Sequence, residues 1–204
     1  MYHDQAIQHL SKDKKMRQLI SSIDQSQMHH IQPDRQVREH LISSIVSQQL
    51  SVKVAKVIHL RFCDLFGGAV PGSNDILDKD ISEFRACGLS GQKAQYIQNI
   101  ARFFEDENIK NEHFHDLPDE EIIRILTQIK GVGKWTVEMV LIFCLARPDV
   151  FALDDFGIMS SIKQLYNLQL EGKELKIKVL HIAEKWKPFR STACLYLWAF
   201  KDVK

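Results

Sequence analysis

Two apolar helical segments joined by a very short turn constrain this chain more than any other feature. Apolar residues before the turn recur at i, i+3, i+4 and i+7 on one face of a helix, namely Ile122, Ile125, Leu126 and Ile129. The same spacing is kept after the turn by Val137, Val140, Leu141 and Cys144. Helices joined by so short a link must pack against each other, so the sequence predicts a helical hairpin.

The turn between these helices, Gly131-Val132-Gly133, can present backbone N–H groups to a ligand. Glycine tolerates positive φ angles and leaves the N–H groups uncovered. These groups lie at the positive N-terminal end of the second helix, where phosphate binds readily. A dinucleotide-binding loop is disfavoured, because no strand pattern precedes the glycines and Thr136 stands where a third glycine belongs. If the glycines stood alone, a simple helix cap would be the better interpretation.

The residues that follow the turn give it a more specific meaning. Lys134-Trp135-Thr136 comes next, and Asp149-Val150-Phe151-Ala152-Leu153-Asp154-Asp155 follows the second helix. This combination closely resembles the helix-hairpin-helix DNA glycosylases, specifically the DNA-3-methyladenine glycosylase II branch. The blocks SQQLS, GLSGQKAQYIQNIA and EKWKPFRSTACLYLW are also similar to that family, so the resemblance covers about residues 35–201.

Composition excludes several other classes of protein. Of the 204 residues, 45% are hydrophobic, but no run of about 18 apolar residues exists to span a membrane. The N-terminus is polar and mixed in charge, unlike a signal peptide. The cysteines are far apart without metal-ligand spacing, which predicts reduced core thiols and no iron–sulfur loop. We therefore expect a cytoplasmic protein that works with the chromosome.

The overall charge gives no support to nucleic-acid binding. The chain has 27 basic and 26 acidic residues, a net charge of +1, whereas DNA-binding proteins usually carry a basic surplus. A protein that grips phosphates through backbone N–H groups needs fewer lysines. Lys53, Lys56 and Lys93 are further candidates for phosphate contacts, although isolated lysines are usually only solvated.

The fold class is predicted to be all-α, with about ten helices. No segment alternates with period two strongly enough to indicate a strand. One helix is expected over residues 4–22 and one helical piece around 76–84. The resemblance implies two packed helical halves with an active-site cleft between them. The whole chain, 1–204, would be a single HhH-GPD glycosylase unit, with one half at 35–147 and the other formed by 1–34 plus 148–204.

Asp154 and Asp155 are the first candidates for catalysis. From spacing alone, both would be interpreted as caps of the helix that follows. The resemblance makes Asp155 the essential carboxylate and leaves Asp154 as the cap. Cleavage of an N-glycosidic bond develops positive charge on the sugar. A carboxylate beneath the anomeric carbon would stabilise that charge and could also orient or deprotonate a water molecule.

Trp135 and Trp198 match family positions that line the base pocket. An indole face attracts a flipped cationic base by about 0.5–2 kcal/mol. An alkylated base such as 3-methyladenine is already cationic and leaves without protonation, so no second acid is needed. The alternative for both tryptophans is a place in the core, and that alternative is stronger for Trp198, whose helix is apolar nearly all round.

The paired glutamines in SQQLS predict a wedge. A base must be turned out of the duplex before it can be attacked, and a side chain must fill the gap. Gln49 is the first choice for that wedge and Leu50 the second, with Gln48 and Ser51 in support. A polar helix–helix connection with Ser51 as N-cap is the alternative, and it explains two adjacent glutamines less well.

The remaining site residues belong to the hairpin. Gly131, Gly133, Lys134 and Thr136 are expected to bind DNA. No cofactor and no catalytic metal are expected. By resemblance, however, a cation could be held by backbone carbonyls of the hairpin, those of Thr127, Ile129 and Val132, and would serve DNA binding only.

Together these residues predict a base-excision DNA glycosylase. It would act as a monomer on double-stranded DNA, hydrolyse alkylated purines from it, and lack a lyase step. A same-fold glycosylase for oxidised bases or mismatches is the nearest alternative, but bifunctional relatives carry lysine where this chain has Trp135. A non-catalytic helix-hairpin-helix module is another alternative, and it would need neither Asp155 nor the paired glutamines.

Overall fold

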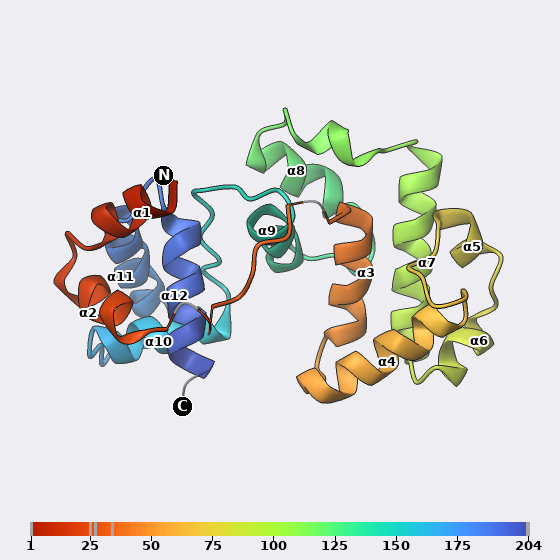
Figure 1. Cartoon of the computed structure of the whole chain (residues 1–204), viewed down its shortest axis with the longest axis horizontal. Helices are drawn as coiled ribbons and strands as arrows, with labels where there is room; N and C mark the ends of the chain where they lie inside the picture. The colour runs from red at the N-terminus through yellow and green to blue at the C-terminus, as the bar shows by residue number, and fades with distance from the viewer. Residues whose placement is uncertain (1, 25, 27, 34, 203–204) are drawn as a thin grey trace. The chain divides into compact units, whose positions relative to one another are not determined.

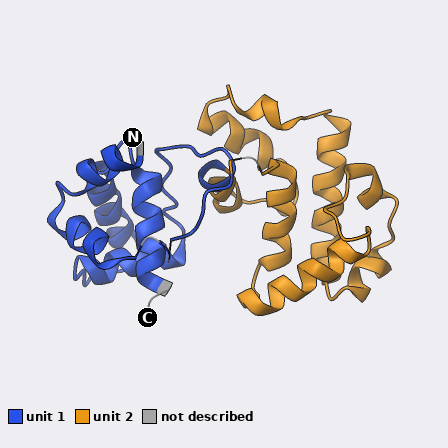
Figure 2. Ribbon diagram, in the orientation of Figure 1, with its two compact units in different colours: residues 1–32, 141–204 blue, residues 33–140 orange. Residues whose placement is uncertain are grey.

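A computed structural model describes the chain except for residues 1, 25, 27, 34, 203 and 204. The described residues form twelve α-helices and contain no strand, which confirms the predicted all-α class (Figure 1). They divide into two compact units, residues 1–32 with 141–204, and residues 33–140 (Figure 2). Within this described part, none of the helices has the length and apolar character that crossing a membrane requires.

Unit 1 is built around its last helix. Its helices are α1 (Tyr2–Leu10), α2 (Lys14–Ser22), α10 (Phe156–Leu165), α11 (Gly172–Glu184) and α12 (Arg190–Asp202). Helix α12 packs against α10, α1 and α2. It is apolar nearly all round because neighbours cover it on several sides, and it buries Ala193, Cys194, Leu195, Tyr196 and Leu197.

Unit 2 is built around its longest helix. Its elements are α3 (Val37–Ser47), α4 (Val52–Asp64), α5 (Ser73–Leu77), α6 (Ile81–Ala86), α7 (Gly91–Asp106), a short 3-10 helix (Asn111–Phe114), α8 (Asp119–Leu126) and most of α9 (Lys134–Phe143). Helix α7 packs against α3, α5 and α6. The rings of Phe62 and Phe84 stack in this core at 5.9 Å between centroids.

The predicted helix over residues 4–22 is wrong as a single element. The structure divides it into α1 and α2. The carboxylate of Asp13 accepts hydrogen bonds from the backbone N–H groups of Lys15 (2.8 Å) and Met16 (3.3 Å). Asp13 therefore starts a new helix within the polar stretch of residues 11–15, which the prediction included in one helix.

The helical piece expected around 76–84 is also two helices, α5 and α6. Glu83 accepts a hydrogen bond from the backbone N–H of Asp80 at 3.0 Å, which fixes the start of α6. These two divisions explain why the described residues form twelve α-helices where the sequence predicted about ten.

Candidate active site

Asp155 lies at the N-terminus of α10 with its carboxylate held in one orientation. Its Oδ1 accepts a hydrogen bond from the backbone N–H of Ile158 at 2.8 Å and another from Nε1 of Trp198 at 3.0 Å. The residue is only 9% exposed. The helix dipole and these two donors stabilise a negative charge at this position. The arrangement therefore presents a fixed anion.

Asp154, the expected helix cap, has a different role. The structure assigns the cap to Asp155, while Asp154 Oδ1 accepts a hydrogen bond from Lys176 Nζ at 2.5 Å. The expectation that Asp154 caps the helix is therefore wrong. Its side chain is directed instead towards α11, where it forms an exposed ion pair of small energetic value.

Trp198 lies in an aromatic cluster beside the carboxylate. Its indole stacks on Phe143 with 5.6 Å between ring centroids and 29° between planes. The ring of His29 meets both of them edge-on, at 6.1 Å from Trp198 and 6.2 Å from Phe143. Because Phe143 covers one face of the indole, Trp198 has less surface for a base than the sequence suggested. The hydrogen bond to Asp155 could not be read from the sequence.

Gly157 leaves space beside this hydrogen bond. A Cβ atom at this position would lie 3.1 Å from Asp155 Oδ1 and 3.3 Å from Trp198 Cδ1. Glycine costs a helix about 1 kcal/mol relative to alanine. The absence of a side chain here lets the indole approach the carboxylate.

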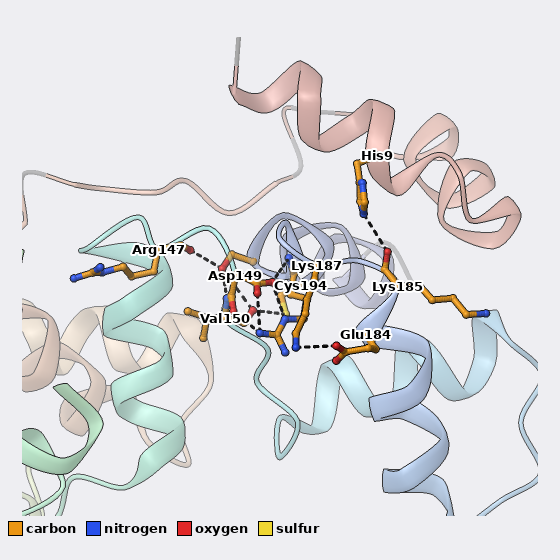
Figure 3. A network of polar contacts seen from close by, with 10 residues as sticks. His9, Arg147, Asp149, Val150, Glu184, Lys185, Lys187 and Cys194 are labelled. Atoms are coloured by element: carbon orange, nitrogen blue, oxygen red, sulfur yellow. Dashed lines mark hydrogen bonds and ion pairs between the residues drawn. The ribbon is translucent and has the colours of Figure 1, made fainter. Parts of the chain in front are cut away.

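Helix α12 also holds the start of the loop that leads to Asp155 (Figure 3). The guanidinium of Arg190 donates to both carboxylate oxygens of Asp149, from Nε at 2.7 Å and from Nη2 at 2.9 Å. The hydroxyl of Ser191 donates to the carbonyl of Arg147 at 2.6 Å and accepts from the backbone N–H of Val150 at 2.9 Å. One helix therefore holds this loop at its start, and through Trp198 at its end. The sequence showed these residues in family-like blocks but gave them no role.

The hairpin turn in unit 2 depends on its two glycines for different reasons. Gly131 has φ +107°, and a Cβ there would lie 2.3 Å from Cγ of Tyr96. Gly133 has no atom within 4 Å of a Cβ position and is exposed. The turn is also tied to α7 by Asn99, whose Nδ2 donates to the carbonyl of Lys130 at 3.1 Å. Gly131 therefore serves packing, whereas Gly133 leaves an open backbone.

The first turn of α9 presents two side chains and buries a third. Trp135 is 40% exposed, whereas Thr136 is only 3% exposed. Lys134 is exposed, with Nζ 3.5 Å from the carboxylate of the buried Glu138. A side-chain contact between Thr136 and DNA does not fit this burial, so the side-chain surface of the hairpin comes from Lys134 and Trp135.

The turn between α3 and α4 contains the candidate wedge. Gln49 is exposed and has φ +59°, while Leu50 is partly buried. Gln48 ends α3, and Ser51 caps α4 through its hydroxyl, which accepts from Val54 N–H at 3.4 Å. The expected N-cap at Ser51 is confirmed. Of the two wedge candidates, Gln49 is the more exposed.

The remaining predictions concern lysines that could contact phosphates and a cation held by the hairpin. Lys53 and Lys56 are exposed on α4. Of the carbonyls of Thr127, Ile129 and Val132 considered for a cation, that of Ile129 accepts a hydrogen bond from Val132 N–H at 2.9 Å. Among the residues that the structure describes, no group of three His, Cys, Asp or Glu side chains is placed to hold a metal.

Comparison with known proteins identifies a family and similar structures. A family model described as "HhH-GPD superfamily base excision DNA repair protein" matches residues 42–188. The DNA-3-methyladenine glycosylase 1 of Schizosaccharomyces pombe is 37% identical over 193 residues, 93% of this chain and 84% of that protein. A solved structure of the 3-methyladenine DNA glycosylase Mag1 from the same yeast, in complex with abasic DNA, superposes with a TM-score of 0.84 at 36% identity, covering 95% of each chain. The DNA-3-methyladenine glycosidase of Bacillus halodurans gives a TM-score of 0.79 at 31% identity, covering 95% of this chain and 87% of that one.

Proposed function

This chain belongs to the HhH-GPD superfamily of base excision DNA repair proteins, and on that premise we propose that it is a DNA glycosylase for alkylated purines. It hydrolyses the N-glycosidic bond of a flipped base such as 3-methyladenine and leaves the abasic sugar uncut. Its substrate is double-stranded DNA that contains damaged bases, on which it acts as a monomer.

One observation supports this proposal above the others, the fixed carboxylate of Asp155. Its Oδ1 is held by Ile158 N–H and Trp198 Nε1. As the bond between base and sugar breaks, its electron pair goes to the base and positive charge grows on the sugar. An anion that is already oriented stabilises this charge without reorganising during the reaction.

The leaving base and the attacking water complete the chemistry. An N-alkylated purine is cationic, so the electron pair it receives makes it neutral and no proton donor is required. Water then adds to the anomeric carbon, and Asp155 orients it and takes up its proton. Each step needs only a carboxylate and water, so the proposal includes no metal or cofactor.

The proposed absence of a lyase step depends on Trp135. Strand cleavage would need an amine that forms a Schiff base with the sugar, and bifunctional relatives carry lysine at this place. Lys134 is adjacent, but neighbours on a helix point about 100° apart. Its ammonium lies 3.5 Å from Glu138, one turn further along the same helix. We assign Lys134 to phosphate contact and Trp135 to the base.

DNA binding in this proposal uses two features of unit 2. The exposed backbone around Gly133, at the start of α9, accepts a phosphate without sequence preference. The exposed side chain of Gln49 fills the gap left by the flipped base. Both features act through few charges, which fits the net charge of +1.

The proposal is tested by incubating the protein with methylated duplex DNA and separating the released bases. Release of 3-methyladenine, with the strand still intact and no adduct trapped by borohydride, is the expected result. No release from the methylated duplex, with release from a duplex that carries oxidised bases, would favour the related glycosylases for that damage. A borohydride adduct that disappears in Lys134→Ala would contradict the absence of a lyase step.

A further inference from the structure

We propose that Lys93 is a positioning residue that holds the wedge turn, residues 47–51, in the shape that presents Gln49 to duplex DNA. The use of this turn for base flipping rests on the proposed function. The support that Lys93 gives to the turn rests only on contacts within unit 2.

Lys93 reaches the wedge turn from a distant part of the sequence. It lies in the first turn of α7, where its backbone N–H donates to the hydroxyl of Ser90 at 3.2 Å. Its ammonium donates to the carbonyl of Val46 at 2.8 Å and to that of Gln48 at 2.7 Å. These carbonyls belong to the last turn and the cap of α3. A single side chain therefore joins the start of α7 to the residue immediately before Gln49.

These carbonyls are a suitable target for an ammonium group. The last carbonyls of a helix have no partner within the helix, and the negative end of the helix dipole attracts a cation. The backbone N–H groups of Gln48 and Leu50 donate to the carbonyls of Ser44 and Ser47, each at 3.1 Å. The contacts of Lys93 add to these local bonds and anchor the turn to another helix.

The conformation of Gln49 explains why the turn needs this support. Its φ of +59° is in the left-handed region, which residues other than glycine adopt at a cost in free energy. Such conformations persist when the surrounding contacts hold them in place. The same backbone geometry leaves the Gln49 side chain exposed at the tip of the turn. Lys93 therefore keeps the candidate wedge ordered before DNA arrives.

A phosphate contact by Lys93, which the sequence suggested, fits these distances less well. The ammonium is partly buried and already donates to two carbonyls. Burial also lowers the pKa of Lys93, as expected for a cation removed from water. A phosphate-binding lysine and a turn-supporting lysine give different results when they are replaced.

The structural part of the proposal is tested by hydrogen exchange in the free protein. Lys93→Met keeps the apolar stem but removes the donors, and Lys93→Arg keeps donors and charge. In Lys93→Met, amides in residues 44–51 should exchange about tenfold faster, while those in residues 95–104 of α7 stay unchanged and show that the fold is intact. Lys93→Arg should exchange more slowly than Lys93→Met in residues 44–51. Unchanged exchange there in Lys93→Met would overturn the proposal.

The functional part compares two substrates that carry the same 7-methylguanine. One is a normal duplex, and in the other the lesion lies opposite an abasic site, where flipping is easier. Lys93→Met should lose about tenfold more activity on the normal duplex than on the substrate with the abasic site. Gln49→Ala should show the same difference, because both changes impair the wedge. Equal loss on both substrates would overturn the positioning role.

Salt dependence separates this role from phosphate contact. Lys134→Met should lower the slope of log affinity against log salt by about one for undamaged duplex, whereas Lys93→Met should leave the slope unchanged. A reduced slope in Lys93→Met would favour the phosphate contact and contradict the proposal. A wild-type protein that releases no base would overturn the proposed function instead, and the exchange experiment would still decide the role of Lys93.

Discussion

The pairing of an indole N–H with the Asp155 carboxylate is the most specific residue-scale feature of this molecule. Trp198 Nε1 and Ile158 N–H both donate to Asp155 Oδ1, and Gly157 leaves the space that the indole needs. The tryptophan therefore orients the carboxylate in addition to shaping its surroundings. Sequence reasoning placed Trp198 in the base pocket and could not distinguish these two roles.

Replacing Trp198 by phenylalanine separates the two roles. Trp198→Phe keeps an aromatic ring against Phe143 but removes the N–H donor to Asp155. A hydrogen bond to a charged group contributes about 1.5–3 kcal/mol, so base release at saturating enzyme should slow by about tenfold to hundredfold. Single-turnover kinetics on a methylated duplex would measure this. A weaker affinity for the damaged duplex with an unchanged saturating rate would show that Trp198 acts only by stacking.

The two glycines of the hairpin differ at the scale of the element. Gly133→Ala adds a methyl group in open space, so the fold should be unaffected while the methyl group hinders a phosphate at the α9 N-terminus. Duplex binding, damaged or not, should weaken by about tenfold, as measured by fluorescence anisotropy. Gly131→Ala is the matched comparison, because its Cβ would overlap the Tyr96 ring. Gly131→Ala should therefore lower the melting temperature of the protein. A Gly133→Ala protein that is destabilised but binds DNA with normal affinity would contradict these assignments.

Helical periodicity predicted which segments form helices better than it predicted where each helix begins and ends. The hairpin could be predicted because apolar spacing and the glycine turn agree. The prediction of one helix over residues 4–22 missed the division between α1 and α2, which falls in the polar stretch of residues 11–15, where Asp13 caps α2. The contacts of Lys93 and Arg190 join segments more than 40 residues apart. Local sequence patterns do not indicate contacts between residues so far apart, so these contacts could be identified only in the structure.

At the scale of the whole molecule, the lack of strand-like alternation predicted the all-α class correctly, and family-like blocks along the chain predicted the family correctly. Net charge did not help, because a chain with +1 charge can still present a local backbone site for phosphate. Within the units, Asp155 and Trp198 lie together in unit 1, and the hairpin and wedge turn belong to unit 2.

Folding stability should depend on pH through a partly buried histidine in unit 2. Burial first, and the charge of Arg35 second, lower the pKa of His40 to about 4. The unfolded chain takes up this proton near pH 6.5, so stability should fall as the pH drops from 6.5 towards 4, by up to about 3 kcal/mol. Urea unfolding between pH 7.5 and 4.5 would measure the fall. His40→Gln should flatten the profile, although not completely, because burial also lowers the pKa of His59. An identical profile in the variant would rule out His40 as a source of this dependence.

The charge of Asp155 is tested most directly by measuring base release from methylated duplex DNA by the wild-type protein and by Asp155→Asn. Asparagine keeps the shape and the oxygen that caps α10 but removes the negative charge. The rate should fall by about a thousandfold or more, while duplex binding and the unfolding midpoint change little. Asp154→Asn is the matched control, and its rate should stay close to that of the wild type, because the ion pair of Asp154 with Lys176 is exposed. Equal rates for wild type and Asp155→Asn would contradict the central assignment of the catalytic carboxylate.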